Sequence, residues 1–112
     1  MNPSAPPTVI ITGAARRLGR EMALALSAAG WQVAVHYRSS ADEALRTVAD
    51  CEVTSLRAGH VDARHAAFPA DLADEAATRA LLPQVVERLG AVDAVINNAS
   101  LFEHDSAASF GY

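Results

Sequence analysis

The sequence of 112 residues is long enough for one small domain, and its composition, 51% apolar and 20% charged, excludes a disordered chain. A formal net charge of −4 argues against a general attraction to nucleic acid or to anionic membranes. The single cysteine, Cys51, excludes a disulfide framework within the chain and favours a cytoplasmic protein. No apolar stretch is long enough to span a bilayer, and the first residues show no signal-peptide pattern.

The first part of the chain alternates between strand and helix patterns. We expect residues 1–7 to form a loose, proline-rich lead-in, followed by buried strands over 8–12 and 31–37. Between the two strands a helix is predicted to begin after Gly13 and to end before Gly30. Its predicted inward face carries Leu18, Met22, Ala25, Leu26 and Ala29.

A capping box predicts the start of the next helix. Ser40 and Glu43 have the S-x-x-E spacing, in which the two side chains accept hydrogen bonds from amides at the helix start. This helix is predicted to end before Gly59. Its predicted inward face carries Leu45, Val48, Ala49, Val53 and Leu56. Residues 58–65 are interpreted as a solvated loop, whose two histidines and aspartate are not expected to bind a metal.

The remaining elements are an edge strand, a helix and a last strand. Strand 66–70 contains Pro69, which cannot donate to a ladder and therefore belongs at a sheet edge. A helix follows from Asp74 and is predicted to kink at Pro83. Its predicted inward face carries Leu81, Leu82, Val85, Val86 and Leu89. The last strand is predicted over 92–97.

Strands that alternate with helices predict βαβ units and a parallel sheet, and therefore the α/β class. Right-handed crossovers in a Rossmann-type doubly wound sheet give the strand order 3-2-1-4, which places the proline-containing strand at an edge. We interpret residues 8–112 as the N-terminal part of one dinucleotide-binding domain, half of the fold and incomplete at its C-terminus.

The turn between the first strand and the first helix suits a phosphate. Gly13 and Gly19 bracket the turn, where helix N-terminal amides attract anions and bare backbone allows close approach. Arginines at this positively polarised helix end are unfavourable unless an anion binds there. Five residues separate the glycines and Arg20 follows the second one, so the turn is not the P-loop of an ATPase.

Three motifs together resemble the short-chain dehydrogenase/reductase family. The turn 12–19, TGAARRLG, resembles the family's T-G-x-x-x-G/R-x-G, and Asp71-Leu72 and the N-N-A-S of 97–100 follow the third and fourth strands as in the family. The resemblance covers about residues 8–102, and the HYRSS after the second strand makes it most similar to pteridine reductases. It implies that Arg16 and Arg17 attend the phosphates of the cofactor, whereas Arg20 is interpreted as a solvated side chain.

The end of the second strand indicates which nicotinamide cofactor binds. An NAD site places an acidic residue there, but this chain has none between Glu21 and Asp42. Arg38, with the hydroxyls of Ser39 and Ser40, instead suits the 2′-phosphate of NADP(H). The predicted cofactor-binding residues are Gly13, Arg16, Arg17, Leu18, Gly19, His36, Tyr37, Arg38, Ser39, Ser40, Asp71, Leu72, Asn98, Ala99 and Ser100.

The resemblance implies an NADPH-dependent oxidoreductase that transfers a hydride to a pterin-like or carbonyl substrate. The family uses a Tyr-x-x-x-Lys pair, which this chain lacks because it contains no lysine, and a complete member would be about twice as long. We therefore expect the cofactor-binding half of a cytoplasmic homo-oligomer, a dimer or tetramer, with no catalysis by this half alone. Ser100 and Phe102 are expected to contact the substrate, Phe102 by stacking on the pterin.

Two alternatives remain open. In the first, the chain is a stand-alone, non-catalytic module that binds a nucleotide or a partner. In the second, it is part of a reductase of the same family that acts on a 3-oxoacyl or sugar ketone. The intact mass of the natural gene product distinguishes the module from the reductase. Phe102 is a core residue rather than a stacking surface in the alternative interpretation of its position.

Overall fold

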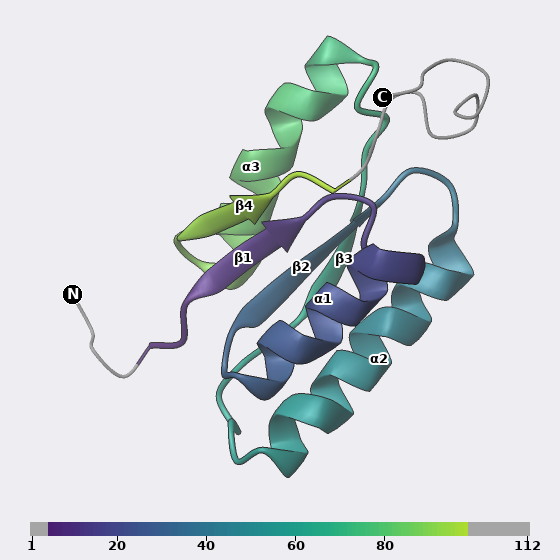
Figure 1. Cartoon of the computed structure of the whole chain (residues 1–112). Helices are drawn as coiled ribbons and strands as arrows, with labels where there is room; N and C mark the ends of the chain where they lie inside the picture. Colours follow the sequence, from purple (N-terminus) through teal and green to yellow (C-terminus); the bar gives the residue numbers. More distant parts are fainter. Residues whose placement is uncertain (1–4, 99–112) are drawn as a thin grey trace.

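A parallel ladder joins every neighbouring pair of strands in the computed structural model, which describes residues 5–98 (Figure 1). The strand order is β3-β2-β1-β4, as the alternation of elements predicted. The elements are β1 (Thr8–Ile11), α1 (Arg17–Ala28), β2 (Gln32–Tyr37), α2 (Ala41–Arg57), β3 (Ala66–Pro69), α3 (Glu75–Leu89) and β4 (Ala94–Ile96). Pro69 ends β3 at the edge of the sheet, which confirms the position inferred from its missing amide hydrogen.

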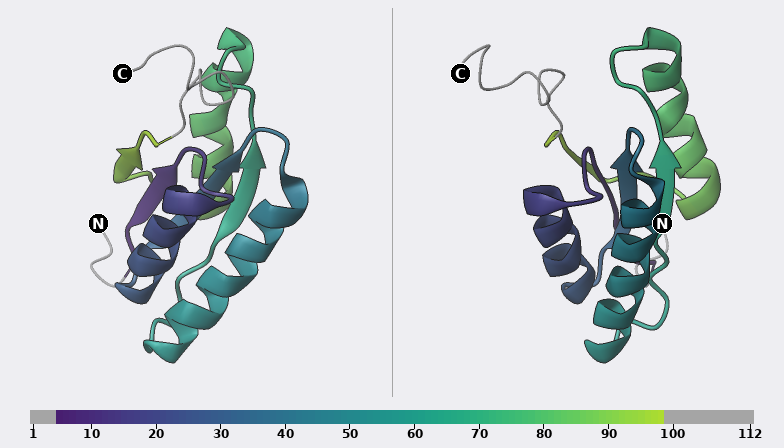
Figure 2. Two further views of the ribbon diagram at one scale, coloured as in Figure 1. Left: turned by 45° about the vertical axis from the view of Figure 1, so that its right-hand side comes forward. Right: turned by 90° about the vertical axis from the view of Figure 1, so that its right-hand side faces the viewer.

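Helices cover both faces of the sheet (Figure 2). On one face, Val9 and Val35 pack with residues of α1 and α2 in a core that is almost completely buried. On the other face, Ile10 packs with Phe68 of β3 and Val85 of α3. Successive residues of β1 therefore enter different cores, as the two-residue period of a strand requires.

The inward faces of α1 and α2 match the prediction only in part. Met22, Leu26 and Val48 pack against the core as predicted, but small residues take its fully buried positions. The buried residues are Gly19, Ala23 and Ser27 in α1, and Ala44, Thr47, Cys51 and Ser55 in α2. Leu18, Leu45 and Leu56 are largely exposed, and Val53 is also exposed. Small side chains let the two helices approach each other and the sheet closely, so the size of a side chain decided the inward face here.

Two predictions about helix ends and faces need correction. Ser40 is the N-cap residue of α2, but its hydroxyl makes no capping hydrogen bond, so the predicted capping box is absent. In α3, Leu82 and Val86 are exposed, and only the remaining members of the predicted stripe are buried. The helix continues through Pro83, and Asp74 caps it by accepting from two amides of the first turn.

The loop before β3 is not uniformly solvated, because His65 is buried. Its Nδ1 accepts from the amide of Val33 at 3.0 Å, and its Nε2 lies 3.0 Å from Oγ of Ser55. Burial lowers the pKa of His65 to about 4, so the ring is neutral near neutral pH. Within residues 5–98, no helix combines the length and the hydrophobicity that crossing a membrane requires.

Candidate functional site

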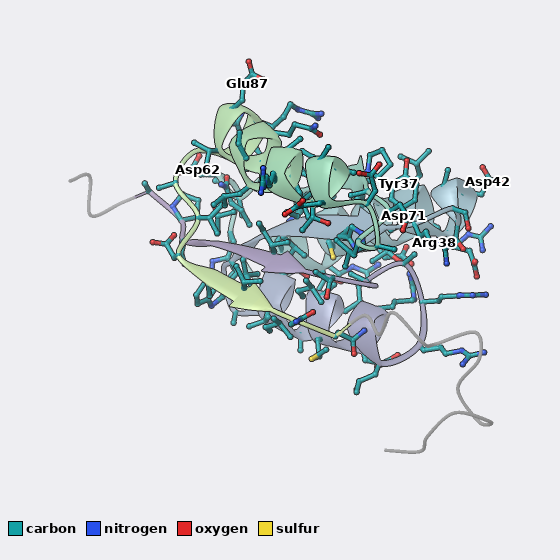
Figure 3. The ribbon with its side chains drawn as sticks, turned by 90° about the horizontal axis from the view of Figure 1, so that it is seen from above. Tyr37, Arg38, Asp42, Asp62, Asp71 and Glu87 are labelled. Atoms are coloured by element: carbon teal, nitrogen blue, oxygen red, sulfur yellow. The ribbon has the colours of Figure 1, made fainter. Side chains whose placement is uncertain are left out.

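The segments that follow the four strands meet at one edge of the sheet, because all strands are parallel. The glycine turn follows β1, residues 38–40 follow β2, Asp71 follows β3 and Asn98 follows β4. Seen from above, Arg38 and Asp71 lie together at one end of the molecule, whereas Asp62 lies apart from them (Figure 3). Most of the predicted cofactor-binding residues are therefore brought together.

Hydrogen bonds from three other elements hold the glycine turn. The amide of Gly13 donates to Nδ1 of His36 at 2.9 Å, and the amide of Ala14 donates to the carbonyl of His36 at 2.9 Å. Nδ2 of Asn98 donates to the carbonyl of Gly13 at 3.3 Å. Oγ1 of Thr47 in α2 donates to the carbonyl of Ala15 at 2.9 Å. Contacts within the protein therefore hold the turn on several sides.

Gly19 allows α1 to approach the turn closely. A Cβ at this position would lie 2.8 Å from Nδ2 of Asn98 and 2.9 Å from Cα of Ala14, closer than real Cβ atoms approach other atoms. Only glycine fits here, because the contacts include rigid backbone. The second glycine of the turn therefore serves packing between helix, turn and the end of β4.

The N-terminus of α1 carries no anionic partner of its own. Its N-cap residue, Arg16, provides no side-chain capping bond, and its first turn contains no acidic residue. The free amides of this turn and the helix dipole make it a favourable place for an anion. Leu18, in the same turn, exposes 64% of its surface.

The three arginines of the turn have different environments. Arg17 has a φ of 59°, in the left-handed region that favours glycine, and its exposed side chain has no partner among the described residues. Arg16 is exposed, and its Nη1 makes a long ion pair with Oε1 of Glu43 at 3.8 Å. Arg20 was predicted to be a solvated side chain, but this prediction is wrong. Arg20 pairs with Asp50 and donates to Oγ1 of Thr47. It fastens α1 to α2.

Polar side chains at the ends of β2 and β3 form the second half of the site. Nε of Arg38 lies 3.9 Å from Oδ1 of Asp71, and both side chains are at least half exposed. The hydroxyls of Ser39 and Ser40 make no hydrogen bond in the part of the chain that is described. Tyr37 is half-buried against the core on the α1 and α2 side, and its carbonyl accepts from the amide of Ala70.

The end of β4 is tied to the end of β1. Oγ1 of Thr12 lies 3.2 Å from Oδ1 of Asn97 and accepts from the amide of Asn98 at 2.8 Å. The predicted site residues Ala99, Ser100 and Phe102 lie outside the described residues. Among residues 5–98, no three His, Cys, Asp or Glu side chains converge as metal ligands would.

The sequence did not reveal the residues that support the turn from behind. Thr47 was not singled out, and Asn97 was noted only as part of the N-N-A-S motif. His36 was predicted to meet the cofactor, but its ring is buried and bonded to backbone. The sequence offered one signal for Thr47. This polar residue lies one helical turn before Cys51, on a helix whose apolar residues lie on another face.

Comparison with known proteins gives a consistent result. Residues 7–110 match the family described as short chain dehydrogenase. The 3-oxoacyl-(acyl-carrier-protein) reductase FabG of Staphylococcus aureus is 34% identical over 94 residues, which are 84% of this chain and 35% of that protein. The 1-cyclohexenylcarbonyl-CoA reductase of Streptomyces collinus is 37% identical over 91 residues, 81% of this chain and 30% of that enzyme.

Solved structures agree with the sequence relatives. A short chain dehydrogenase from Burkholderia cenocepacia in complex with NADP superposes with a TM-score of 0.76 at 34% identity, covering 90% of this chain and 38% of that one. The matched residues span about a third of the length of these curated relatives.

Proposed function

Because the chain belongs to the short-chain dehydrogenase family, we propose that it binds NADP(H) and supplies the cofactor-binding part of a reductase. When bound, NADPH supplies the hydride that is transferred to the substrate. This chain contains no lysine and therefore lacks the Tyr-x-x-x-Lys pair expected from the resemblance. Its residues bind and orient the cofactor, and the proton donor belongs to another part of the protein.

The pyrophosphate is proposed to lie at the N-terminus of α1. The amides of Gly13 and Ala14 are already bonded to His36, so the phosphate oxygens take the free amides of the first helical turn. Arg16 and Arg17 add positive charge from exposed positions beside this turn. The contacts at Gly19 keep the helix end close to the turn, so the amides stay aligned.

The 2′-phosphate is proposed to lie at the end of β2, and this position carries the assignment of NADP(H). Arg38 is exposed and has only a long contact with Asp71, while the hydroxyls of Ser39 and Ser40 have no partner in the described structure. A cation with two free hydroxyls matches the charge and the acceptor oxygens of a phosphate monoester. Asp71 would hold the adenine, as the family resemblance implies.

The experiment that tests this proposal is a fluorescence titration of the intact protein with NADPH and with NADH. We expect NADPH to bind at least about tenfold more tightly, since one charge-assisted contact contributes about 1.5–3 kcal/mol. Equal affinity for the two cofactors would contradict the assignment of residues 38–40. Absence of binding to either would contradict the proposed function as a whole.

Two substrate classes are proposed. The resemblance to pteridine reductases, with Phe102 after the N-N-A-S turn, favours a dihydropterin. The names of the relatives favour a 3-oxoacyl thioester. Turnover of both substrates by the intact protein and by Phe102→Ala distinguishes them. Stacking predicts a selective loss of pterin turnover at nearly unchanged thermal stability, whereas a core role predicts a lower melting temperature and an equal loss for both substrates.

The intact protein is further proposed to be a cytoplasmic homo-oligomer. The lone Cys51 supports a reducing compartment, and burial raises the pKa of its thiol to about 11, so the thiol stays protonated and unreactive. The mass of the purified protein in solution measures the number of subunits.

A further inference from the structure

The buried ring of His36 connects two segments that the proposed cofactor site requires. His36 lies in β2 and is only 2% exposed. Its Nδ1 accepts from the amide of Gly13 at 2.9 Å, and its Nε2 lies 2.8 Å from the carbonyl oxygen of Ala70. A neutral imidazole has one N–H group, and the amide of Gly13 occupies Nδ1 as acceptor. The network therefore assigns the proton to Nε2, which donates to Ala70.

The main chain of the same residue adds a third bond. The carbonyl of His36 accepts from the amide of Ala14 at 2.9 Å, so one residue of β2 holds two consecutive amides of the glycine turn. Ala70 directly precedes Asp71, the residue proposed to meet adenine. One side chain thus sets the position of the glycine turn relative to the loop after β3.

We infer that His36 is a positioning residue for the nucleotide, which accepts from the Gly13 peptide and so holds the glycine turn in the arrangement that the cofactor needs, while the bond to Ala70 orients the ring. The inference rests on the proposed NADP(H) binding, and it changes the role expected for His36. The ring does not contact the cofactor, because both of its nitrogen atoms are occupied by backbone groups. Its effect on binding is transmitted through the turn.

The chemistry of the ring fits this role. Burial lowers the pKa of His36, partly offset by the bond to Ala70, so the ring stays neutral and Nδ1 stays an acceptor. A protonated ring would direct a second N–H toward the amide of Gly13. Among the described residues, none of the charged side chains at this end hydrogen-bonds to the ring: Arg16, Arg17, Arg38, Asp42, Glu43, Asp71, Asp74 and Glu75.

Two near-isosteric variants separate the two bonds of the ring. In His36→Asn the amide oxygen replaces Nδ1 and accepts from Gly13, but the side chain is too short to reach Ala70. In His36→Gln the amide nitrogen replaces Nε2 and donates to Ala70, while the half-buried amide of Gly13 loses its acceptor. Each variant loses one hydrogen bond, so the two should lower the melting temperature by similar amounts.

The affinity for NADPH, measured in the intact protein, should differ between the variants although their stabilities match. We expect His36→Asn to stay within about threefold of wild type and His36→Gln to lose about tenfold or more, because the latter releases the turn. Equal losses, or losses that follow the melting temperature, would overturn the inference alone. A wild-type protein that binds no NADPH would overturn the proposed function and the inference with it.

Hydrogen exchange in the wild-type protein provides a test that does not require the variants to fold. If the bond from Gly13 to His36 is coupled to binding, NADP⁺ should slow exchange of the Gly13 amide by reciprocity. The amide of Thr8, which donates to Asp93 at 2.9 Å at the other end of β1, reports general stabilisation. Stronger slowing at Gly13 than at Thr8 supports the inference, and equal slowing or none at Gly13 overturns it.

Discussion

Nε of Arg38 lies 3.9 Å from Oδ1 of Asp71, so an exposed ion pair joins the ends of β2 and β3. Pairs of this kind, long and solvated, contribute only about 0–1 kcal/mol. A phosphate that takes Arg38 therefore displaces a weak partner, and Asp71 remains bonded to the amide of Ala73 at 3.0 Å. The pair keeps the guanidinium near the proposed 2′-phosphate at little energetic cost to binding.

Reversing the charge at position 38 should change cofactor preference. Arg38→Glu is expected to weaken NADPH by about tenfold or more and NADH much less, since only NADPH carries the 2′-phosphate. Arg64→Glu, the same change at an exposed residue near the opposite end of the sheet, should leave both affinities unchanged. Fluorescence titration measures both. If Arg38→Glu weakens the two cofactors equally, Arg38 does not bind the 2′-phosphate.

Arg17 should carry a conformational cost that its function offsets. Its backbone φ of 59° lies in the left-handed region, which costs a residue with a side chain more than it costs glycine. Arg17→Gly should therefore raise the free energy of unfolding by about 1 kcal/mol. The same variant should weaken NADPH and NADH alike, by about tenfold, because both have the pyrophosphate. Thermal melting and cofactor titration measure the two effects. A variant that gains stability at full affinity would leave Arg17 without a role in binding.

Gly19 and Gly59 provide a matched pair of glycine substitutions. Gly19→Ala is expected to lower the free energy of unfolding by about 1–3 kcal/mol and to abolish cofactor binding, because the new Cβ collides with Ala14 and Asn98. Gly59→Ala meets nothing within 4 Å, and its φ of 92° costs about 1 kcal/mol, so binding should persist. Comparable loss of binding in both variants would show that general destabilisation, and not the helix contact, is responsible.

The order of the elements could be predicted because its signals are local. Gly30 and Gly59 follow the ends of α1 and α2 as expected, and Pro69 identified the edge strand from its missing amide hydrogen alone. Hydropathy predicted only part of the inward faces of α1 and α2, because Met22, Leu26 and Val48 pack against the core but small residues fill its fully buried positions. Leu45 is 61% exposed while Thr47 is fully buried. The helices lie so close together that the size of a side chain, and not its hydrophobicity, decides which residue fits between them.

The candidate site also has parts that could be predicted from the sequence and parts that could not. Arg38 and Asp71 were each predicted to follow a strand, and because the strands are parallel these two positions lie at the same end of the sheet. The bridge through His36 could not be predicted, because it depends on how far a ring in β2 reaches toward the turn after β1 and the loop after β3. Thr47 could not be found either, since its bond to Ala15 follows from the position of α2 against the turn.

Stability should fall in mild acid because His65 is buried. Its pKa is about 4 in the folded protein against an ordinary value of 6.5, so between these pH values the unfolded chain binds a proton that the folded chain does not. The free energy of unfolding is therefore unaffected by this group above pH 6.5 and falls as pH drops toward 4, by an amount on the order of 3 kcal/mol.

Denaturant unfolding at a series of pH values measures this dependence. His65→Asn keeps an acceptor for the amide of Val33 and removes the titrating group, so its stability should depend less steeply on pH over the same range. Burial also lowers the pKa of His36, which adds a dependence of the same sign and remains in the variant. A variant with the wild-type slope would mean that His65 does not titrate with folding.

The exposed edge of β4 should make the 112-residue chain self-associate when it is expressed alone. Within the described sheet β4 pairs only with β1, and Val95, which lies beside Ile10 in the register, is 59% exposed. An unpaired apolar strand is a template for another chain, so the wild-type chain should dimerise, aggregate or bind a hydrophobic dye. Val95→Lys should reduce this association, because an edge lysine opposes strand pairing.

Leu45→Lys is the control, since Leu45 is equally exposed but lies on α2. If both lysines act alike, general hydrophobicity and not the strand edge drives association, and a monodisperse wild-type monomer that melts cooperatively would favour the stand-alone module over the reductase.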